Sequence, residues 1–206
     1  MKKWVLIICI MLAMARPALA ANVNYYVDCS ATSGDGTTTA TNGANAAWKD
    51  MTDIDWAGSI ATSVAGGDTV YVNLNRGCKW DIQTMTVATS GASGRPITIQ
   101  AYGTGARPNI DAGDVLGTAL SLTLATGVAT YVTIKDLDLE GGTKRVVLIG
   151  NTAGTSYNII IDNVLIHDPV ENQGQAKGHC LKVIGSNVTV KNSEIYNCEK
   201  IGRAHV

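Results

Sequence analysis

The sequence contains no phenylalanine, and aromatic residues account for only 5% of its 206 residues. Any buried core must therefore be built from Val, Ile, Leu and Ala. Charged residues are also scarce, at 16% against 46% hydrophobic residues, a balance that excludes intrinsic disorder. The formal net charge of −1 gives no basic excess, so we expect no nucleic-acid partner. Proline is rare while Gly, Thr and Asn are abundant, which favours short strands and turns in one domain.

A second long apolar run is also absent, so we expect no membrane span. The one such run, Trp4–Ala15, has twelve residues, too few to cross a bilayer. Two lysines precede it, and Ala18–Ala20 follows as an Ala-Leu-Ala cleavage site. We interpret residues 1–20 as a signal peptide cleaved after Ala20, which predicts a secreted protein, periplasmic or extracellular. Loss of the leader's three basic residues lowers the formal net charge from −1 to −4.

No Cys-x-x-Cys motif occurs, and the three histidines show no zinc-ligand spacing relative to the cysteines, so no structural metal is predicted. Four cysteines remain after the leader, and export permits them to form disulfides. They are Cys29, Cys78, Cys180 and Cys198. Three pairings are possible, and the sequence alone does not choose between them.

The second half of the chain contains a loose repeat with spacings of 27 and 29 residues. Each copy has apolar residues at its first, third and eighth positions and Asp or Asn at its fifth. The three copies are Val132–Leu139, Ile159–Ile166 and Val188–Ile195. Each copy reads as a strand, a tight turn and a second short strand. Such a unit cannot bury its apolar face alone, so we expect successive copies to stack about 4.8 Å apart as coils.

The two-residue period of a strand predicts that Val188 and Val190 point into the stack while Thr189 points out. The turn residues Asn163 and Asn192 should lie at the same corner of successive coils, where their amides would hydrogen-bond to each other. The alternative is a β-sandwich, in which short strands with turns also recur.

A helix is predicted over residues 48–64, with Trp48, Met51, Ile54 and Ile60 on one side. The end of a stack of coils exposes unpaired backbone groups and core side chains. A helix that lies across that end covers both, and this is the role that we assign to residues 48–64.

Several segments of the first half resemble the start of secreted right-handed parallel β-helix proteins of the pectate-lyase-like superfamily, and the later repeats are similar to its coils. The segments are Tyr25–Cys29, Ala47–Lys49, Gly67–Val70, Arg76–Trp80, Gly94–Ile99 and Ala101–Pro108. The resemblance covers about residues 24–200. It implies an all-β fold, a right-handed parallel β-helix with an N-terminal capping helix, and it suggests that Cys29 pairs with Cys78.

Members of this superfamily include polysaccharide lyases, glycoside hydrolases and surface proteins without known catalysis. The resemblance therefore implies a protein that acts on or binds polysaccharide, with a non-catalytic surface or adhesion module as the alternative. A lyase of this fold would use a Lys or Arg base, often with Ca²⁺ held by carboxylates. A hydrolase would need two carboxylates spaced across the glycosidic bond. We expect the full-length protein to be a monomer.

The candidate catalytic residues are few. Lys182 alternates with apolar Leu181 and Val183, so it should face outward from a strand. His179 begins the same strand, and Glu171 lies in the loop before it. Lys182, His179 and Glu171 could line a sugar-binding groove. The alternative is solvated charge on a strand and a loop.

Other residues fit a groove less directly. Lys177 lies in the same loop, and His167–Asp168 ends the preceding coil. Asp138 and Glu140 alternate along a strand after the corner residue Asp136, a pattern that would suit Ca²⁺ but is also typical of solvent-facing residues. Trp56 and Trp80 could stack on sugar rings, although Trp80 lies beside a cysteine and is better suited to packing in the cap.

We expect residues 21–112 to form the cap and the first coils and residues 113–200 to form the later coils. The repeat pattern breaks after Cys198, and residues 201–206 equal a translation of a common sequencing-library adapter. We therefore expect residues 201–206 to be an artefact and the chain to be a fragment of a longer gene, whose missing coils would hold most of a catalytic set. Made alone, the 206-residue product should associate through its open last coil.

Overall fold

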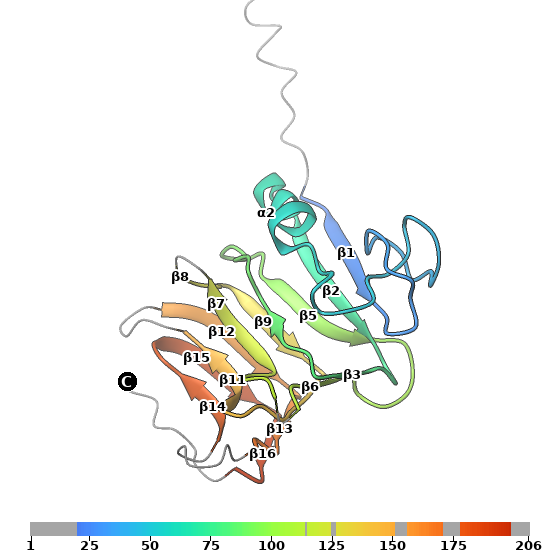
Figure 1. The fold of residues 1–206 in the computed structure, drawn as a ribbon. Helices are drawn as coiled ribbons and strands as arrows, with labels where there is room; N and C mark the ends of the chain where they lie inside the picture. Colours follow the sequence, from blue (N-terminus) through green and yellow to red (C-terminus); the bar gives the residue numbers. More distant parts are fainter. Residues whose placement is uncertain (1–19, 114, 125–126, 151–155, 171–177, 199–206) are drawn as a thin grey trace, which may run out of the picture.

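The computed structural model describes residues 20–113, 115–124, 127–150, 156–170 and 178–198. Within these residues the chain winds through three parallel sheets, here called sheets A, B and C (Figure 1). Each complete turn of the chain adds one strand to each sheet, so that the sheets form the sides of one stack. This arrangement is a parallel β-helix.

The strands are given in the order in which they neighbour one another. Sheet A contains β1 (Asn22–Val27), β2 (Thr69–Asn75), β5 (Ile97–Tyr102), β9 (Val132–Lys135), β12 (Ser156–Asp162) and β15 (Ser186–Lys191). Sheet B contains β3 (Lys79–Asp81), β6 (Asn109–Asp111), β10 (Asp138–Glu140), β13 (Leu165–His167) and β16 (Glu194–Tyr196). Sheet C contains β4 (Met85–Thr86), β7 (Leu120–Leu124), β11 (Arg145–Ile149) and β14 (His179–Val183). The short β8 (Gly127–Val128) pairs antiparallel with β7.

The strand register aligns the three segments that the sequence analysis interprets as a repeat. The first residues of the three copies, Val132, Ile159 and Val188, are paired across sheet A. Their eighth residues are likewise paired across sheet B. A β-sandwich is wrong for this chain because equivalent strands of successive coils are parallel neighbours rather than members of two facing antiparallel sheets.

The core is a set of aliphatic columns, one residue per coil. On sheet A, Val72, Ile99, Ile134 and Ile161 are stacked in register and fully buried. Each such side chain contributes roughly 1.5–3 kcal/mol by leaving water. Val190 continues this column beneath Ile161 but is 39% exposed. The inward direction predicted for Val190 is therefore correct, while its burial is incomplete.

The corner between sheets A and B explains why Asp or Asn recurs at the fifth repeat position. Asp136, Asn163 and Asn192 have φ of 60°, 57° and 52°, the left-handed region that Asp and Asn tolerate best among residues with a side chain. The predicted hydrogen bond between the two Asn amides is wrong. Asn163 Nδ2 donates to Asp136 Oδ1 (2.5 Å), whereas Asn192 Nδ2 donates to Asp162 Oδ1 (2.8 Å).

An amide pair does form at the corner that leads into sheet A. Asn158 and Asn187 have φ of 53° and 56°, and Asn187 Nδ2 donates to Asn158 Oδ1. The backbone conformation therefore selects the residue type at each corner. The nearest acceptor then determines the side-chain hydrogen bond.

The capping helix is present but shorter than predicted, and residues 48–55 lie outside it. A helical segment begins with the π-helical turn η1 (Trp56–Ile60) and continues as α2 (Ala61–Gly66). Trp48 is extended because its backbone exchanges hydrogen bonds with Tyr26 and Asp28 beside β1. The carboxylate of Asp55 accepts hydrogen bonds from the backbone of Gly58 and Ser59, which fixes where the helix begins.

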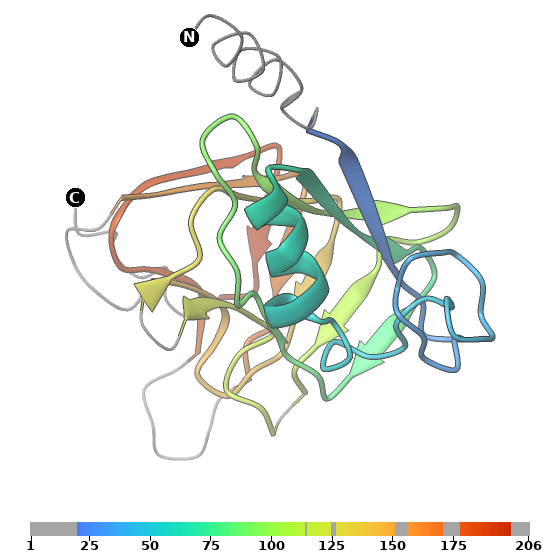
Figure 2. The ribbon, with the colours of Figure 1, turned by 90° about the horizontal axis from the view of Figure 1, so that it is seen from above.

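Both views place the helical segment across the end of the stack that begins with β1 and β2 (Figures 1 and 2). Trp56 and Ile60 point into the core and are almost fully buried. The segment therefore has the covering role assigned to it from the sequence. Among the described residues, no helix is long and apolar enough to cross a membrane.

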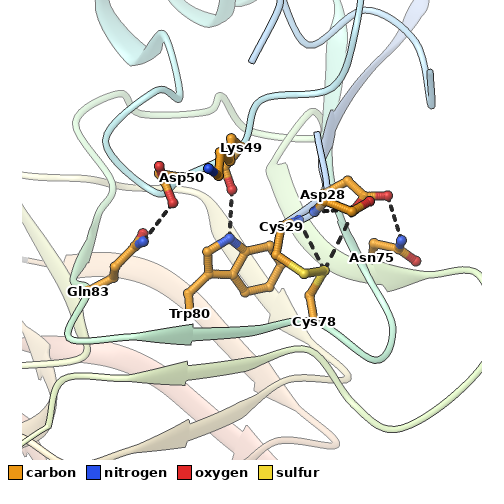
Figure 3. The surroundings of a disulfide bond; sticks show 9 residues. Asp28, Cys29, Lys49, Asp50, Asn75, Cys78, Trp80 and Gln83 are labelled. Carbon is orange, nitrogen blue, oxygen red and sulfur yellow. Dashed lines mark hydrogen bonds between the residues drawn. A yellow bond between two sulfur atoms is a disulfide. The ribbon is translucent and has the colours of Figure 1, made fainter. Parts of the chain in front are cut away.

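Two disulfides close the ends of the structure, Cys29–Cys78 and Cys180–Cys198. The first joins the loop after β1 to the residue before β3, beside buried Trp80 (Figure 3). Trp80 Nε1 donates to the backbone oxygen of Lys49 at 2.7 Å, so the disulfide and this hydrogen bond both tie the cap to the first coil.

Replacing Cys29 and Cys78 together by Ser is expected to lower the free energy of unfolding by about 2–4 kcal/mol, because the crosslink restricts the unfolded chain over a separation of 49 residues. Urea denaturation without reductant measures this loss. The matched control is the Cys180/Cys198 double Ser variant, which should lose less because its separation is only 18 residues. Free thiols at both positions in a non-reducing peptide map would contradict the prediction.

Candidate functional site

The outer side of sheet B carries a row of polar side chains, one per coil. Each strand of this sheet has three residues, of which the middle one points into the core. The third residues, paired in register, are Asp81, Asp111, Glu140, His167 and Tyr196. The first residues are Lys79, Asn109, Asp138, Leu165 and Glu194. We call these two rows, together with Asp168, the acidic face.

Lys79 lies at the centre of one half of the acidic face. Its Nζ is 3.1 Å from a carboxylate oxygen of each of Asp81, Asp111 and Glu140, which belong to three successive strands. Hydrogen bonds to Asp111, Asp81 and Glu140 raise the pKa of Lys79 well above its ordinary value. The three carboxylates therefore favour the ammonium form of Lys79.

His167 lies at the centre of the other half. Its Nε2 is 2.7 Å from Asp138 Oδ1, and its Nδ1 is 2.7 Å from Asp168 Oδ2. Its ring stacks on that of Tyr196, with centroids 4.6 Å apart and 8° between the planes. Burial by itself would lower the pKa of His167, but the hydrogen bonds to Asp168 and Asp138 outweigh it, and the pKa is raised. The same contact lowers the pKa of Asp168.

Stability should depend on the protonation of His167. The imidazolium donates to both carboxylates, whereas neutral imidazole can donate to only one. Because the folded-state pKa is raised above the unfolded value of about 6.5, the contribution is full below that pH and is lost as pH rises through the folded-state pKa. We expect wild type to be more stable than His167→Gln by on the order of 1–3 kcal/mol at low pH, and this difference to shrink at alkaline pH.

Melting temperatures of wild type and His167→Gln across pH 5–9 measure this difference. The groups that face the ring are Asp138, Glu140, Asp168 and Tyr196. A difference between the two proteins that is constant with pH would show that His167 stabilises the fold without titrating.

A hollow of about 230 Å³ lies beside the third-residue row. Its lining residues are Asp111, Gly113, Glu140, Gly141, Asp168 and Val170. Gly141 has φ of 76°, and a Cβ built there would lie 2.5 Å from Asp111 Oδ1. A side chain at this position would therefore displace the Asp111 carboxylate, which the Gly113 amide also holds at 2.7 Å. Because Gly141 carries no side chain, the Asp111 carboxylate keeps its place in the lining of the hollow, together with Glu140.

The structure brings together only part of the set named from the sequence. His167, Asp168, Asp138 and Glu140 meet on the acidic face. Lys182 and His179 lie on β14 of sheet C, on another side of the stack, and their groove role stays a prediction. Glu171 and Lys177 lie outside the described residues.

Trp56 and Trp80 are only 6% and 2% exposed, so neither can stack on a sugar ring in this structure. Asp136 occupies the corner, as expected. Sequence reasoning missed Lys79, Asp81, Asp111 and Tyr196. The signal for the first three was available, because the triplets at 79–81, 109–111 and 138–140 each place an apolar residue between polar ones, with an acid last.

The donor set of the acidic face does not fit Ca²⁺, the ion that the superfamily resemblance implies. Ca²⁺ takes six to eight oxygen ligands. The oxygens of Asp81, Asp111 and Glu140 already surround Lys79 Nζ. The other possible group, Glu140, His167 and Asp168, has ligand atoms within 4.8 Å of one another but includes an imidazole, which Ca²⁺ does not favour. A further group contains Cys29 and Cys78, whose sulfurs form a disulfide.

No protein-family model matches the chain, and no curated protein matches it by sequence. Solved structures do match. The GH136 lacto-N-biosidase from Eubacterium ramulus superposes with a TM-score of 0.64 at 18% identity in its selenomethionine form, over 86% of this chain and 35% of that one. Its native form gives a TM-score of 0.63 at 17% identity. Pectate lyase Pel9A superposes with a TM-score of 0.54 at 14% identity, over 86% of this chain and 48% of that one.

These similarities confirm the fold class predicted from the sequence: the protein is a right-handed parallel β-helix. By name, one of these similar proteins is a GH136 lacto-N-biosidase and the other is a pectate lyase. At 14–18% identity the likeness concerns the fold alone. The chain spans only about a third to a half of the length of these structures.

Proposed function

We propose that this protein is exported, binds glycan on its acidic face and hydrolyses it there, with Asp111 and Glu140 as the carboxylate pair. The observation that carries the proposal is their convergence beside the hollow. One oxygen of each lies 3.1 Å from the same nitrogen, Lys79 Nζ, so these two oxygens are within about 6 Å of each other. This bound lies below the roughly 6.5–9.5 Å between the carboxyl groups of inverting glycoside hydrolases and is compatible with the roughly 5–5.5 Å of retaining ones.

The charge of the face argues against a lyase acting on a uronate polymer. Such a substrate is an anion, and its approach to Asp81, Asp111, Glu140 and Asp138 is unfavourable. Lyase chemistry also needs a base that can accept a proton. Lys79, the lysine of this face, is held in its protonated form by three carboxylates. We therefore propose a glycan without uronate charge as the substrate class.

A surface or adhesion module without catalysis is the second candidate, and Tyr196 favours it. Its side chain is held flat against His167 and remains 39% exposed at the edge of the acidic face. A fixed, half-exposed aromatic ring beside polar groups suits binding of a sugar ring whether or not cleavage follows.

A glycan screen of the full chain tests the proposal. The protein is incubated with neutral glycans and with uronate polymers. Released reducing ends report hydrolysis, ultraviolet absorbance reports unsaturated lyase products, and a glycan array reports binding. Reducing ends from neutral glycans are the expected result. Unsaturated product from uronates would overturn the hydrolase assignment, binding without cleavage would favour the surface module, and neither binding nor cleavage would remove the acidic face as a glycan site.

A further inference from the structure

We propose that the ammonium group of Lys79 takes the place of a divalent cation on the acidic face. Three carboxylates from three successive coils converge on Nζ at the same distance, 3.1 Å. An ammonium group has three N–H donors, so its number of donors equals the number of acceptors. Lys79 thereby neutralises and crosslinks Asp81, Asp111 and Glu140, the two tasks that a bridging divalent cation performs at a carboxylate cluster.

The register explains how one side chain reaches three coils. Lys79 begins β3, and Asp81 is the outward residue two positions later on the same strand. Asp111 and Glu140 follow on β6 and β10, one and two strands along the stack. Two strand spacings amount to about 9–10 Å, a span that needs the long stem of a lysine lying along the sheet.

The acidic face also contains the oxygen ligands that a cation would bind if the ammonium group were absent. Asn109 is paired with Lys79 in register, and its Oδ1 is buried without a hydrogen-bond partner among the described residues. With Lys79 removed, the three carboxylates form an all-oxygen set of the kind that Ca²⁺ prefers, on the face that also carries this amide oxygen. Asp138 and Asp168 are not available to it, because both are bonded to His167.

Two consequences follow. The wild-type face needs no divalent cation, so glycan binding there should be unaffected by a chelator; this consequence rests on the proposed function. The second consequence does not: replacing Lys79 with a neutral residue of similar length should convert the cluster into a Ca²⁺ site.

The test compares wild type, Lys79→Met and Lys79→Arg, each as the full chain. Melting temperature is measured in a chelator and in CaCl₂, and Ca²⁺ binding is measured by calorimetry. We expect wild type and Lys79→Arg to melt at the same temperature in both conditions. Lys79→Met should melt on the order of 5 °C lower in the chelator, regain most of this loss in CaCl₂, and bind one Ca²⁺.

A wild-type melting temperature that rises in CaCl₂, with the rise removed by Asp111→Asn, would overturn the proposal, as would a Lys79→Met protein that binds no Ca²⁺. If Lys79→Met does not fold in either condition, the double variant Lys79→Met/Asp81→Asn is compared instead. It has one carboxylate fewer, so the repulsion within the cluster is weaker. Glycan binding by wild type that is lost in the chelator would also overturn the proposal. Absence of glycan binding in every condition would contradict only the proposed function, because the calcium measurements do not use glycan.

Discussion

Replacing Glu140 by Gln should reduce glycan turnover by about 10²–10⁴-fold, the range associated with loss of a general acid or base. The change keeps the shape of the side chain and removes its ionisable group. Lys79 would retain its contacts to Asp81 and Asp111, so the local structure should persist. Asp111→Asn should have an effect of similar size, since a hydrolase needs both carboxyl groups.

The measurement is the rate of reducing-end release from a glycan identified in the screen, with the melting temperature of each variant recorded in parallel. Asp162→Asn is the matched control. Asp162 is a carboxylate on the outer side of sheet A that pairs with Lys191 at 3.3 Å, and its loss should leave turnover within about twofold of wild type. Equal rates for wild type, Glu140→Gln and Asp111→Asn would rule out this pair as the catalytic carboxylates.

Replacing Trp80 by Ala should lower the free energy of unfolding by about 3–5 kcal/mol. Trp80 is 2% exposed, heads the buried column of sheet B above Ile110, and donates to the backbone oxygen of Lys49. Its removal would leave a cavity where the cap meets the first coil, and that carbonyl would lose its donor. It would also loosen Lys79 and Asp81, the outward neighbours of Trp80 on β3.

Urea denaturation of wild type and Trp80→Ala measures this loss, and Val115→Ala is the control. Val115 has 70% of its surface exposed, so its truncation should change stability by no more than about 0.5 kcal/mol. A loss below about 1 kcal/mol for Trp80→Ala would mean that the site collapses around the smaller side chain.

The repeat was predictable because, in a β-helix, residues that stack on successive coils recur at regular intervals along the sequence. Apolar residues that return at fixed positions after 27 and 29 residues must stack, since no single coil can bury them alone. The corner residues indicated the same stacking. Asp136, Asn163 and Asn192 are of the residue types that best tolerate the left-handed backbone conformation found at this corner. Both signals recur at intervals of 27 and 29 residues, so they can be read along the sequence without knowledge of the tertiary structure.

The helix boundary was not predictable from periodicity. Trp48, Met51 and Ile54 have helical spacing, but backbone hydrogen bonds to β1 keep Trp48 extended. Asp55 caps a helix that begins only at Trp56. Pairing with β1 therefore outweighed the helical spacing of the apolar residues, because hydrogen bonds to a neighbouring strand satisfy the backbone groups as well as those of a helix would.

The amino-acid sequence by itself determined that this chain forms stacked coils of parallel strands with a helical cap, and that its outward side chains include acids and histidine. Only the tertiary structure decided which of them meet. Lys79, Asp111, Glu140 and His167 are spread over 89 positions of the sequence, yet they lie on neighbouring strands because each coil returns the chain to the same side of the stack. The register depends on the lengths of several successive coils. The acidic face therefore cannot be predicted from the sequence of any single coil.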